Sequence, residues 1–162
     1  MTYSIGFPSH DNPDHSGRFV HRVSEEIQVR TPHDAAQYLM TNVYTPFDAL
    51  DQEELHVLLL DNKNHITHES LVYRGTVNSI YVRQAEIFKP AVRVNAPAIL
   101  ISHNHPSGDV NPSPEDVRLT QESVMVARLL GIELLDHLVI GRDIWLSLRE
   151  RGLGFDQPPQ LP

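Results

Sequence analysis

The sequence predicts an α/β or α+β domain with a central sheet. Short apolar runs typical of buried strands alternate along the chain with segments that carry helix start signals. No internal repeat or low-complexity block interrupts this alternation. At 162 residues, folding buries roughly 69% of the surface of the unfolded chain. We therefore expect a single domain with a substantial core.

Two segments carry the same helix start signal. Thr31 and Ser113 are each followed by a proline and, two residues after it, by an aspartate, the pattern of an N-cap with a reciprocal capping box. The first helix is expected to run through about Asn42. The second is expected to end at Gly131, a residue suited to the left-handed conformation that closes helices.

The strand candidates and a third helix fill the rest of the domain. A helix is expected over residues 85–94, although Pro90 within it should kink it or end a first segment. The expected strands are residues 55–61, 66–74, 77–83, 97–103, 133–140 and 144–148. The strand expected over residues 97–103 is followed by a loop, residues 104–112.

The structured domain is expected over residues 31–154, between two looser ends. Residues 1–30 start with a stretch rich in Pro, His, Asp and Ser and should form a partly disordered N-terminal arm. The apolar spacing after residue 18 fits either a short helix or an edge strand. Residues 155–162 contain three prolines and should form a frayed tail.

Composition excludes several kinds of site. The chain has no cysteine, which rules out disulfides, thiolate nucleophiles, iron–sulfur clusters and finger-type zinc sites. A metal would have to be held by His, Asp and Glu. The 10 histidines are a large supply of the commonest metal ligand, although most are expected to be ordinary surface residues.

The charge balance disfavours a nucleic-acid partner. Thirteen Lys and Arg residues stand against 21 Asp and Glu residues, and no two basic residues are adjacent. The longest apolar run, residues 96–101, is far short of a membrane span, and the N-terminus has no signal-peptide pattern. A soluble, cytoplasmic protein is expected.

Three residues near the end of a strand could bind one metal ion. His103 and His105 are two apart, so their side chains leave the strand on the same face. Asp116 follows in the first turn of the next helix. Two imidazoles and a carboxylate are a three-ligand zinc set that leaves a fourth position open for water. The alternative is that Asp116 and Ser113 serve only as a capping box.

These residues form a motif that resembles a known family. The run His103-Asn104-His105-Pro106, six residues, then Ser113-Pro114-Glu115-Asp116 matches the JAMM motif of the JAB/MPN metallopeptidases, H-x-H-P, six residues, S-x-x-D. Residues 103–120 and 131–141 resemble the RadC branch in particular. The resemblance covers about residues 52–153.

The resemblance implies a JAB/MPN-like (cytidine-deaminase-like) fold, a central mixed sheet flanked by helices. It also implies one zinc ion per chain on His103, His105 and Asp116, with water as the fourth ligand. Glu53 would be the catalytic base. Glu54 is the alternative, because a one-residue shift in a strand reverses the face. Ser113 would help to hold the oxyanion.

Other features match the branch only in part. The pair Asp136 and His137 fits it and could support the ligands from behind, although a strand histidine satisfied by its neighbour is an equal alternative. The first 50 residues lack the helix-hairpin-helix pattern common in the branch. Gln84-Ala85-Glu86 stands where members often have Pro-Arg-Glu.

The leading hypothesis is a zinc-dependent metallohydrolase, a JAMM-type peptidase or isopeptidase that hydrolyses an amide bond with metal-activated water. A candidate substrate is the C-terminal tail of a ubiquitin-like protein. The alternatives are a RadC-like accessory protein of DNA repair or recombination without peptidase activity and a non-catalytic MPN-like scaffold.

Overall fold

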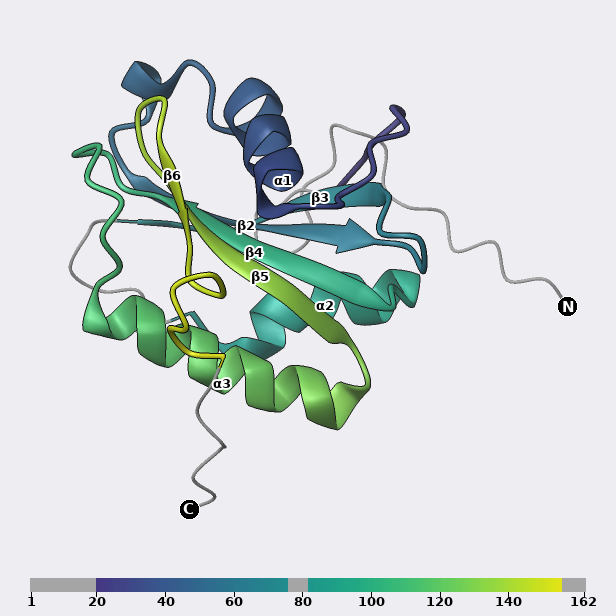
Figure 1. Ribbon diagram of the computed structural model, residues 1–162. Helices are drawn as coiled ribbons and strands as arrows, with labels where there is room; N and C mark the ends of the chain where they lie inside the picture. Colours follow the sequence, from purple (N-terminus) through teal and green to yellow (C-terminus); the bar gives the residue numbers. More distant parts are fainter. Residues whose placement is uncertain (1–19, 76–81, 156–162) are drawn as a thin grey trace, which may run out of the picture.

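The computed structural model describes residues 20–75 and 82–155, which form a six-stranded mixed sheet flanked by helices (Figure 1). The strand order is β1-β3-β2-β4-β5-β6, and every neighbouring pair is antiparallel except β4 and β5, which are parallel. The predicted α/β class is therefore confirmed. The strands are β1 (Val20–Arg22), β2 (Glu53–Leu60), β3 (Ile66–Gly75), β4 (Ala98–Asn104), β5 (Glu133–Ile140) and β6 (Trp145–Ser147).

Helices cover both faces of the sheet. Figure 1 shows α1 (Pro32–Tyr38) on one face, and α2 (Gln84–Val94) and α3 (Pro114–Leu130) side by side on the other. Helix α1 continues into a π-helical turn, η1 (Leu39–Val43), and a 3-10 turn, η2 (Phe47–Ala49), follows. None of the helices in the described ranges is long and apolar enough to cross a membrane.

Both predicted capping boxes are present. The Thr31 hydroxyl accepts a hydrogen bond from the backbone N–H of Asp34, and the Asp34 carboxylate accepts one from the N–H of Thr31. The same reciprocal pair joins Ser113 and Asp116 at the start of α3. Gly131 closes α3 with a positive φ of 68°, which costs a glycine little because it has no Cβ.

Strand β2 lies at the centre of the sheet and is buried along its whole length. Leu55, Val57 and Leu59 pack in the core beneath α2 and α3. Leu58 and Leu60 pack beneath α1. A strand with helices on both faces needs this continuous apolar run, and its alternation sends consecutive side chains to opposite faces.

For the segment after residue 18, the structure shows the edge strand of the two expected alternatives: β1 pairs with β3 at the edge of the sheet, and Val29 farther along is buried. The expected interruption at Pro90 differs from the structure. Helix α2 runs through Pro90 without a break. Pro90 is buried, and its neighbours Ile87, Phe88 and Ala91 pack in the core, which offsets the hydrogen bond that a proline removes. The strand expected over residues 77–83, apart from its last two residues, lies outside the described part of the chain.

Candidate metal centre

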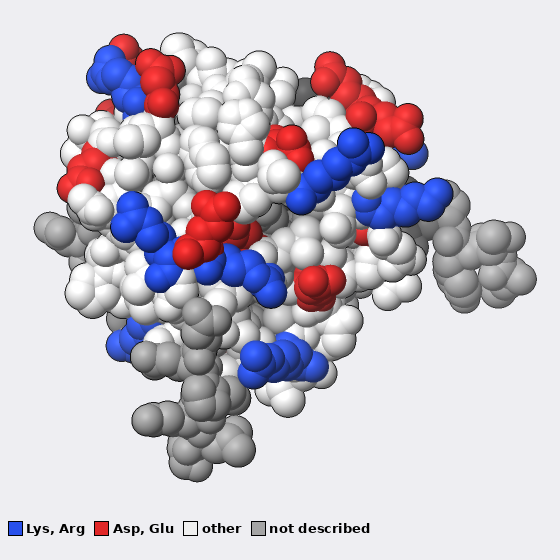
Figure 2. Space-filling model, viewed as in Figure 1, with Lys and Arg blue, Asp and Glu red and all other residues white. Residues whose placement is uncertain are grey.

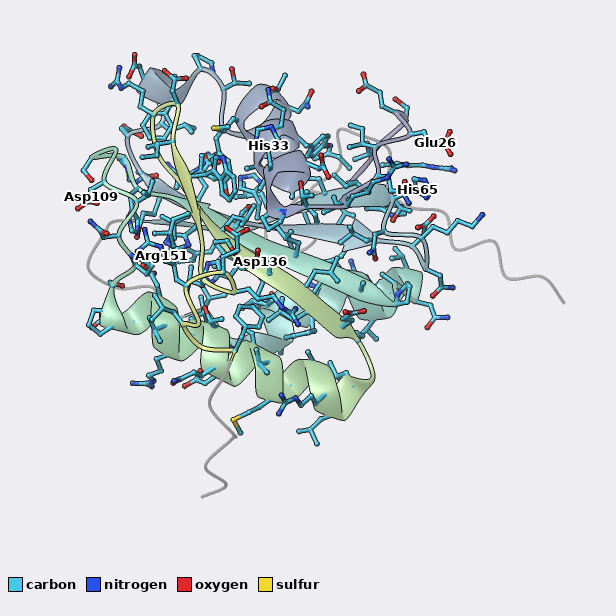
Figure 3. All side chains as sticks on the ribbon, viewed as in Figure 1. Glu26, His33, His65, Asp109, Asp136 and Arg151 are labelled. Carbon is cyan, nitrogen blue, oxygen red and sulfur yellow. The ribbon has the colours of Figure 1, made fainter. Side chains whose placement is uncertain are left out.

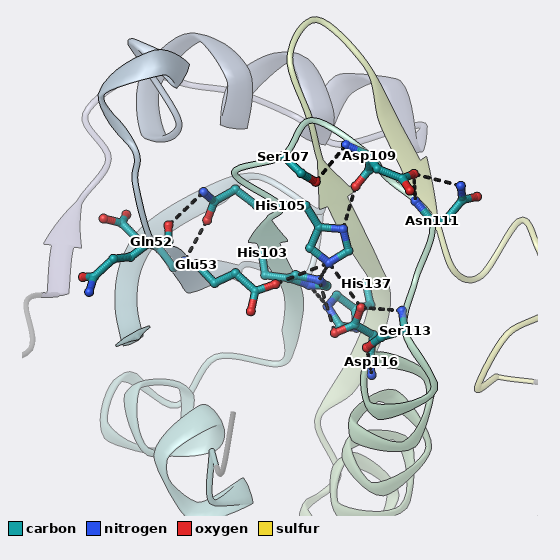
Figure 4. A network of polar contacts seen from close by, with 12 residues as sticks. Gln52, Glu53, His103, His105, Ser107, Asp109, Asn111, Ser113, Asp116 and His137 are labelled. Atoms are coloured by element: carbon teal, nitrogen blue, oxygen red, sulfur yellow. Dashed lines mark hydrogen bonds and ion pairs between the residues drawn. The ribbon is translucent and has the colours of Figure 1, made fainter. Parts of the chain in front are cut away.

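Four polar side chains converge at the end of β4, on the sheet face covered by α2 and α3 (Figure 4). Leu55 pairs with His103 in the antiparallel register of β2 and β4, so Glu53 comes opposite His105, just beyond the end of β4. Asp116 reaches the same place from the first turn of α3. The strand register and a helix start thus position the group.

The donor atoms lie close together. The Nε2 atoms of His103 and His105 are 3.0 Å apart. Asp116 Oδ1 lies 3.3 Å from Nε2 of His103, and Asp116 Oδ2 lies 3.3 Å from Nε2 of His105. Glu53 Oε1 lies 3.4 Å from His105 Nε2. Ligand atoms of Glu53, His103 and His105 all lie within 4.8 Å of one another, a spacing that could hold a metal ion.

The Nδ1 atoms of His103 and His105 each make a hydrogen-bond contact with another group. His105 Nδ1 lies 2.7 Å from the carbonyl oxygen of Asp109, and since a carbonyl only accepts, Nδ1 carries the proton. His103 Nδ1 lies 2.8 Å from Nε2 of His137. In neutral rings with protons on Nδ1, the two Nε2 lone pairs face each other, an arrangement that a cation between them stabilises. The donor set therefore fits a metal ion.

Burial and charge differ among the ionisable groups. Burial acts to raise the pKa of Asp116, but the close contacts of its carboxylate with the rings of His103 and His105 hold that pKa far below its usual range. For His105, burial acts to lower the pKa, and contacts with Asp116 and with the carbonyl of Asp109 raise it overall. A proton or a cation can thus balance the carboxylate.

The buried carboxyl group of Glu53 behaves in the opposite way. Burial raises its pKa, and the nearby imidazoles only partly offset this effect. Its neighbour Glu54 points to the opposite face of β2, where its carboxylate contacts His56 Nε2 at 2.9 Å and Arg74 Nε at 2.8 Å. Of the two candidates for the base, the structure places Glu53 at the site.

Ser113 lies beside Asp116 as the cap of α3. Its hydroxyl oxygen accepts from the N–H of Asp116 at 3.1 Å, and its own N–H donates to Asp116 Oδ2 at 2.8 Å. The same capping box therefore fixes the carboxylate that faces the imidazoles. The capping and ligand interpretations of Asp116 are compatible.

The pair Asp136 and His137 divides between two roles. His137 is fully buried and contacts His103 directly, and burial lowers its pKa to about 3, so its ring is neutral. Asp136 precedes His137 on β5 and lies near the middle of the sheet (Figure 3). Its carboxylate accepts from Ser147 Oγ at 2.6 Å, from the N–H of Arg149 at 3.2 Å and from the backbone N–H of His137 at 2.7 Å. Asp136 therefore holds β6 and the backbone of His137, and it reaches the ligand group only through His137. Its supporting role stays a prediction.

Sequence reasoning missed the role of Asn104, which stands between the two histidines. Its amide oxygen accepts from the N–H of Glu54 at 2.7 Å, and its amide nitrogen donates to the carbonyl of Gln52 at 3.1 Å. These two hydrogen bonds hold the backbone on both sides of Glu53 in place. The sequence signal that could have indicated this role is the position of Asn104 between the two histidines of the H-x-H motif.

Comparisons with known proteins point to one family. A model of the RadC-like JAB domain matches residues 29–153. A UPF0758 protein of Chloroflexus aggregans is 48% identical over 134 residues, covering 83% of this chain and 57% of that protein. UPF0758 proteins of Roseiflexus castenholzii and Geobacillus thermodenitrificans are 46% and 38% identical, covering 83% and 84% of this chain and 56% and 59% of their own lengths. The chain thus spans little more than half of these relatives.

Proposed function

Because the chain belongs to the RadC-like JAB domain family, we propose that it is a zinc-dependent metallohydrolase of the JAMM type, a peptidase or isopeptidase. The observation that carries this proposal is the pair of imidazoles with hydrogen-bonded Nδ1 atoms and facing Nε2 atoms, bridged by the carboxylate of Asp116. Neutral imidazole and carboxylate are ligand types that zinc prefers.

His103, His105 and Asp116 would hold the cation. Asp116 suits a ligand better than Glu53 does, because its two oxygens contact both imidazoles, whereas the carboxylate of Glu53 contacts His105 alone. When bound, a zinc ion supplies a water of lowered pKa and polarises the substrate carbonyl. Three protein ligands leave room for that water.

Glu53 is the proposed general base. Its carboxylate lies at the rim of the ligand group and its pKa is raised by burial, so it binds a proton more readily than an exposed glutamate does. It would take the proton of the attacking water and return it to the leaving amine. The side-chain amide of Asn104 hydrogen-bonds to the backbone on both sides of Glu53, and these bonds fix the position of the Glu53 backbone.

Ser113 is the proposed donor to the oxyanion. Its role as a helix cap uses a lone pair of the hydroxyl oxygen, which accepts from the N–H of Asp116. The hydroxyl hydrogen is not used by the cap, so it can donate to the carbonyl oxygen of a substrate held over the site. Such donors stabilise the charge that develops during attack on an amide.

A protein or peptide substrate fits this chemistry better than a nucleic acid does. The net charge is −8, and on the face in Figure 2 acidic and basic side chains are interspersed, with no continuous basic area. A phosphate backbone binds to clustered cations. The candidate substrate is an amide bond after the flexible C-terminal tail of a ubiquitin-like protein.

Hydrolysis assays test the proposal. Purified protein is incubated with ubiquitin-like fusion proteins and isopeptide-linked conjugates, and products are identified by mass spectrometry. We expect cleavage that stops on chelation, returns with added zinc and is absent in Asp116→Asn. Asp34→Asn is the matched control, since it changes the aspartate of the equivalent capping box at the start of α1, on the opposite face of the sheet (Figure 1). Cleavage that survives chelation would contradict the proposal, and tight DNA binding lost steeply with salt would favour an accessory role in DNA repair.

A further inference from the structure

A buried chain of hydrogen bonds runs behind the candidate metal centre, from β4 through β5 to α3. His103 Nδ1 lies 2.8 Å from His137 Nε2. His137 Nδ1 lies 2.6 Å from Thr120 Oγ1, and that hydroxyl lies 2.7 Å from the backbone carbonyl of Asp116. All four residues are buried. We call this chain, from the Nδ1 atom of His103 to the carbonyl of Asp116, the imidazole relay.

The relay can carry its protons in either direction, and the two directions differ in what His103 offers a cation. If the Thr120 hydroxyl donates to His137, the proton of His137 lies on Nε2 and is donated to His103. His103 then carries its own proton on Nε2, the atom that faces Asp116 and His105, and cannot bind a metal there. In the opposite direction, His103 donates from Nδ1 and its Nε2 lone pair is free.

The backbone carbonyl at the end of the relay selects the second direction. A hydroxyl has one hydrogen, and the carbonyl of Asp116 only accepts, so Thr120 donates to that carbonyl. The hydroxyl oxygen must then accept from His137 Nδ1–H. The two ring nitrogens of His137 contact Thr120 Oγ1 and His103 Nδ1, and full burial favours the neutral ring, so Nε2 of His137 accepts from His103 Nδ1–H.

We propose that Thr120 and His137 are positioning residues that hold His103 in the tautomer able to bind a cation through Nε2. This inference rests on the proposed metal centre and deepens it. Thr120 lies one helical turn after Asp116, so a single turn of α3 fixes both the carboxylate ligand and, through His137, an imidazole ligand on β4. The relay thereby couples two ligands that come from separate elements.

A bulge in the sheet makes the relay possible. Ile99 pairs with Leu134 and Ile101 pairs with His137, so β5 has one extra residue between these pairs. Without it, His137 would point to the face of α1. The extra residue turns the ring of His137 toward α3 and the back of His103.

Zinc affinity of three variants, measured by competition with a chromophoric chelator, tests the inference. Thr120→Val keeps the shape of the side chain but removes the acceptor for His137 Nδ1–H. We expect zinc binding to weaken about 10- to 100-fold, the usual loss when a group behind a metal ligand is removed. Thr120→Ser keeps the hydroxyl and should bind zinc within a few-fold of the parent.

The matched control is Ser123→Ala, which removes another fully buried hydroxyl from α3. Ser123 donates to the side-chain oxygen of Gln84 and is outside the relay, so zinc affinity should not change. Circular dichroism checks that each variant is folded. Equal zinc affinity in Thr120→Val and the parent would overturn the inference and leave the metal centre intact, whereas a parent that binds no zinc would refute the metal centre itself.

The tautomers can also be read directly in the metal-free parent, with no dependence on how a variant folds. Two-bond proton–nitrogen spectra of ¹⁵N-labelled protein distinguish protonated from unprotonated ring nitrogens. We expect a proton on Nδ1 of both His103 and His137, with Nε2 of His137 unprotonated. A parent protein with the His137 proton on Nε2 would overturn the inference.

Discussion

Replacing Glu53 and Glu54 in turn by glutamine should separate activity from stability, because these adjacent side chains lie on opposite faces of β2. Glu53→Gln keeps the shape of the side chain but cannot accept a proton. The loss of a general base is worth about 100- to 10,000-fold in rate, or about 2.7–5.4 kcal/mol of activation free energy. Burial raises the pKa of Glu53, so a neutral replacement should not lower the free energy of unfolding.

Glu54→Gln should do the reverse. The carboxylate of Glu54 bonds to the buried ring of His56 at 2.9 Å, and hydrogen bonds to charged groups contribute about 1.5–3 kcal/mol. Its second bond, to Arg74, adds about 0–1 kcal/mol, since the Arg74 side chain is 57% exposed. We therefore expect a loss of about 1.5–4 kcal/mol in unfolding free energy, with turnover largely kept.

Two assays on the same preparations decide the matter: urea unfolding followed by circular dichroism, and cleavage of a ubiquitin-like fusion at saturating zinc. An active Glu53→Gln beside an inactive Glu54→Gln would refute the assignment of the base. A Glu53→Gln variant that is destabilised more than Glu54→Gln would refute the reasoning from burial.

Three further changes have defined outcomes. Ser113→Ala should keep zinc, lower the unfolding free energy by about 1 kcal/mol as a lost cap and slow cleavage; full cleavage activity would leave Ser113 only as a cap. Burial acts to lower the pKa of His56, but the bonds of its ring to Glu54 and Glu69 raise that pKa above the 6.5 of an ordinary histidine. The stability lost in His56→Gln, measured by urea unfolding, should thus be largest just below pH 6.5 and shrink as pH rises through the folded-state pKa; a loss independent of pH would refute this. Leu59→Ala removes a fully buried side chain and should cost about 2–5 kcal/mol in the same assay, so a cost below about 1 kcal/mol would contradict the core packing.

Local patterns in the sequence predicted the frame of the site. The capping box at Ser113 and the pair His103 and His105 beside a strand end depend on neighbours within a few residues, so they could be read without a fold. The strand signal was strong enough to place β2, although β2 starts two residues earlier than expected and so includes Glu53. That extension sets the face of Glu53.

Features that depend on distant contacts could not be predicted. The bulge that turns His137 toward α3 exists only in the pairing of β4 with β5. Thr120 could be noticed as one turn after Asp116, but its contact with His137 joins residues 17 apart in sequence. Likewise, the hydrogen bonds from Asn104 to the backbone beside Glu53 join residues about 50 apart in sequence, and no local pattern indicates them.

The most direct test of the central claim is the zinc content of the purified protein, measured by inductively coupled plasma mass spectrometry. Because His103, His105 and Asp116 lie at one place with their donor atoms facing each other, we predict about one zinc ion per chain. His103→Ala and His105→Ala should lose it while remaining folded by circular dichroism, and Glu53→Gln should keep it. A parent protein without zinc after zinc loading, or full zinc content in His103→Ala, would contradict the account.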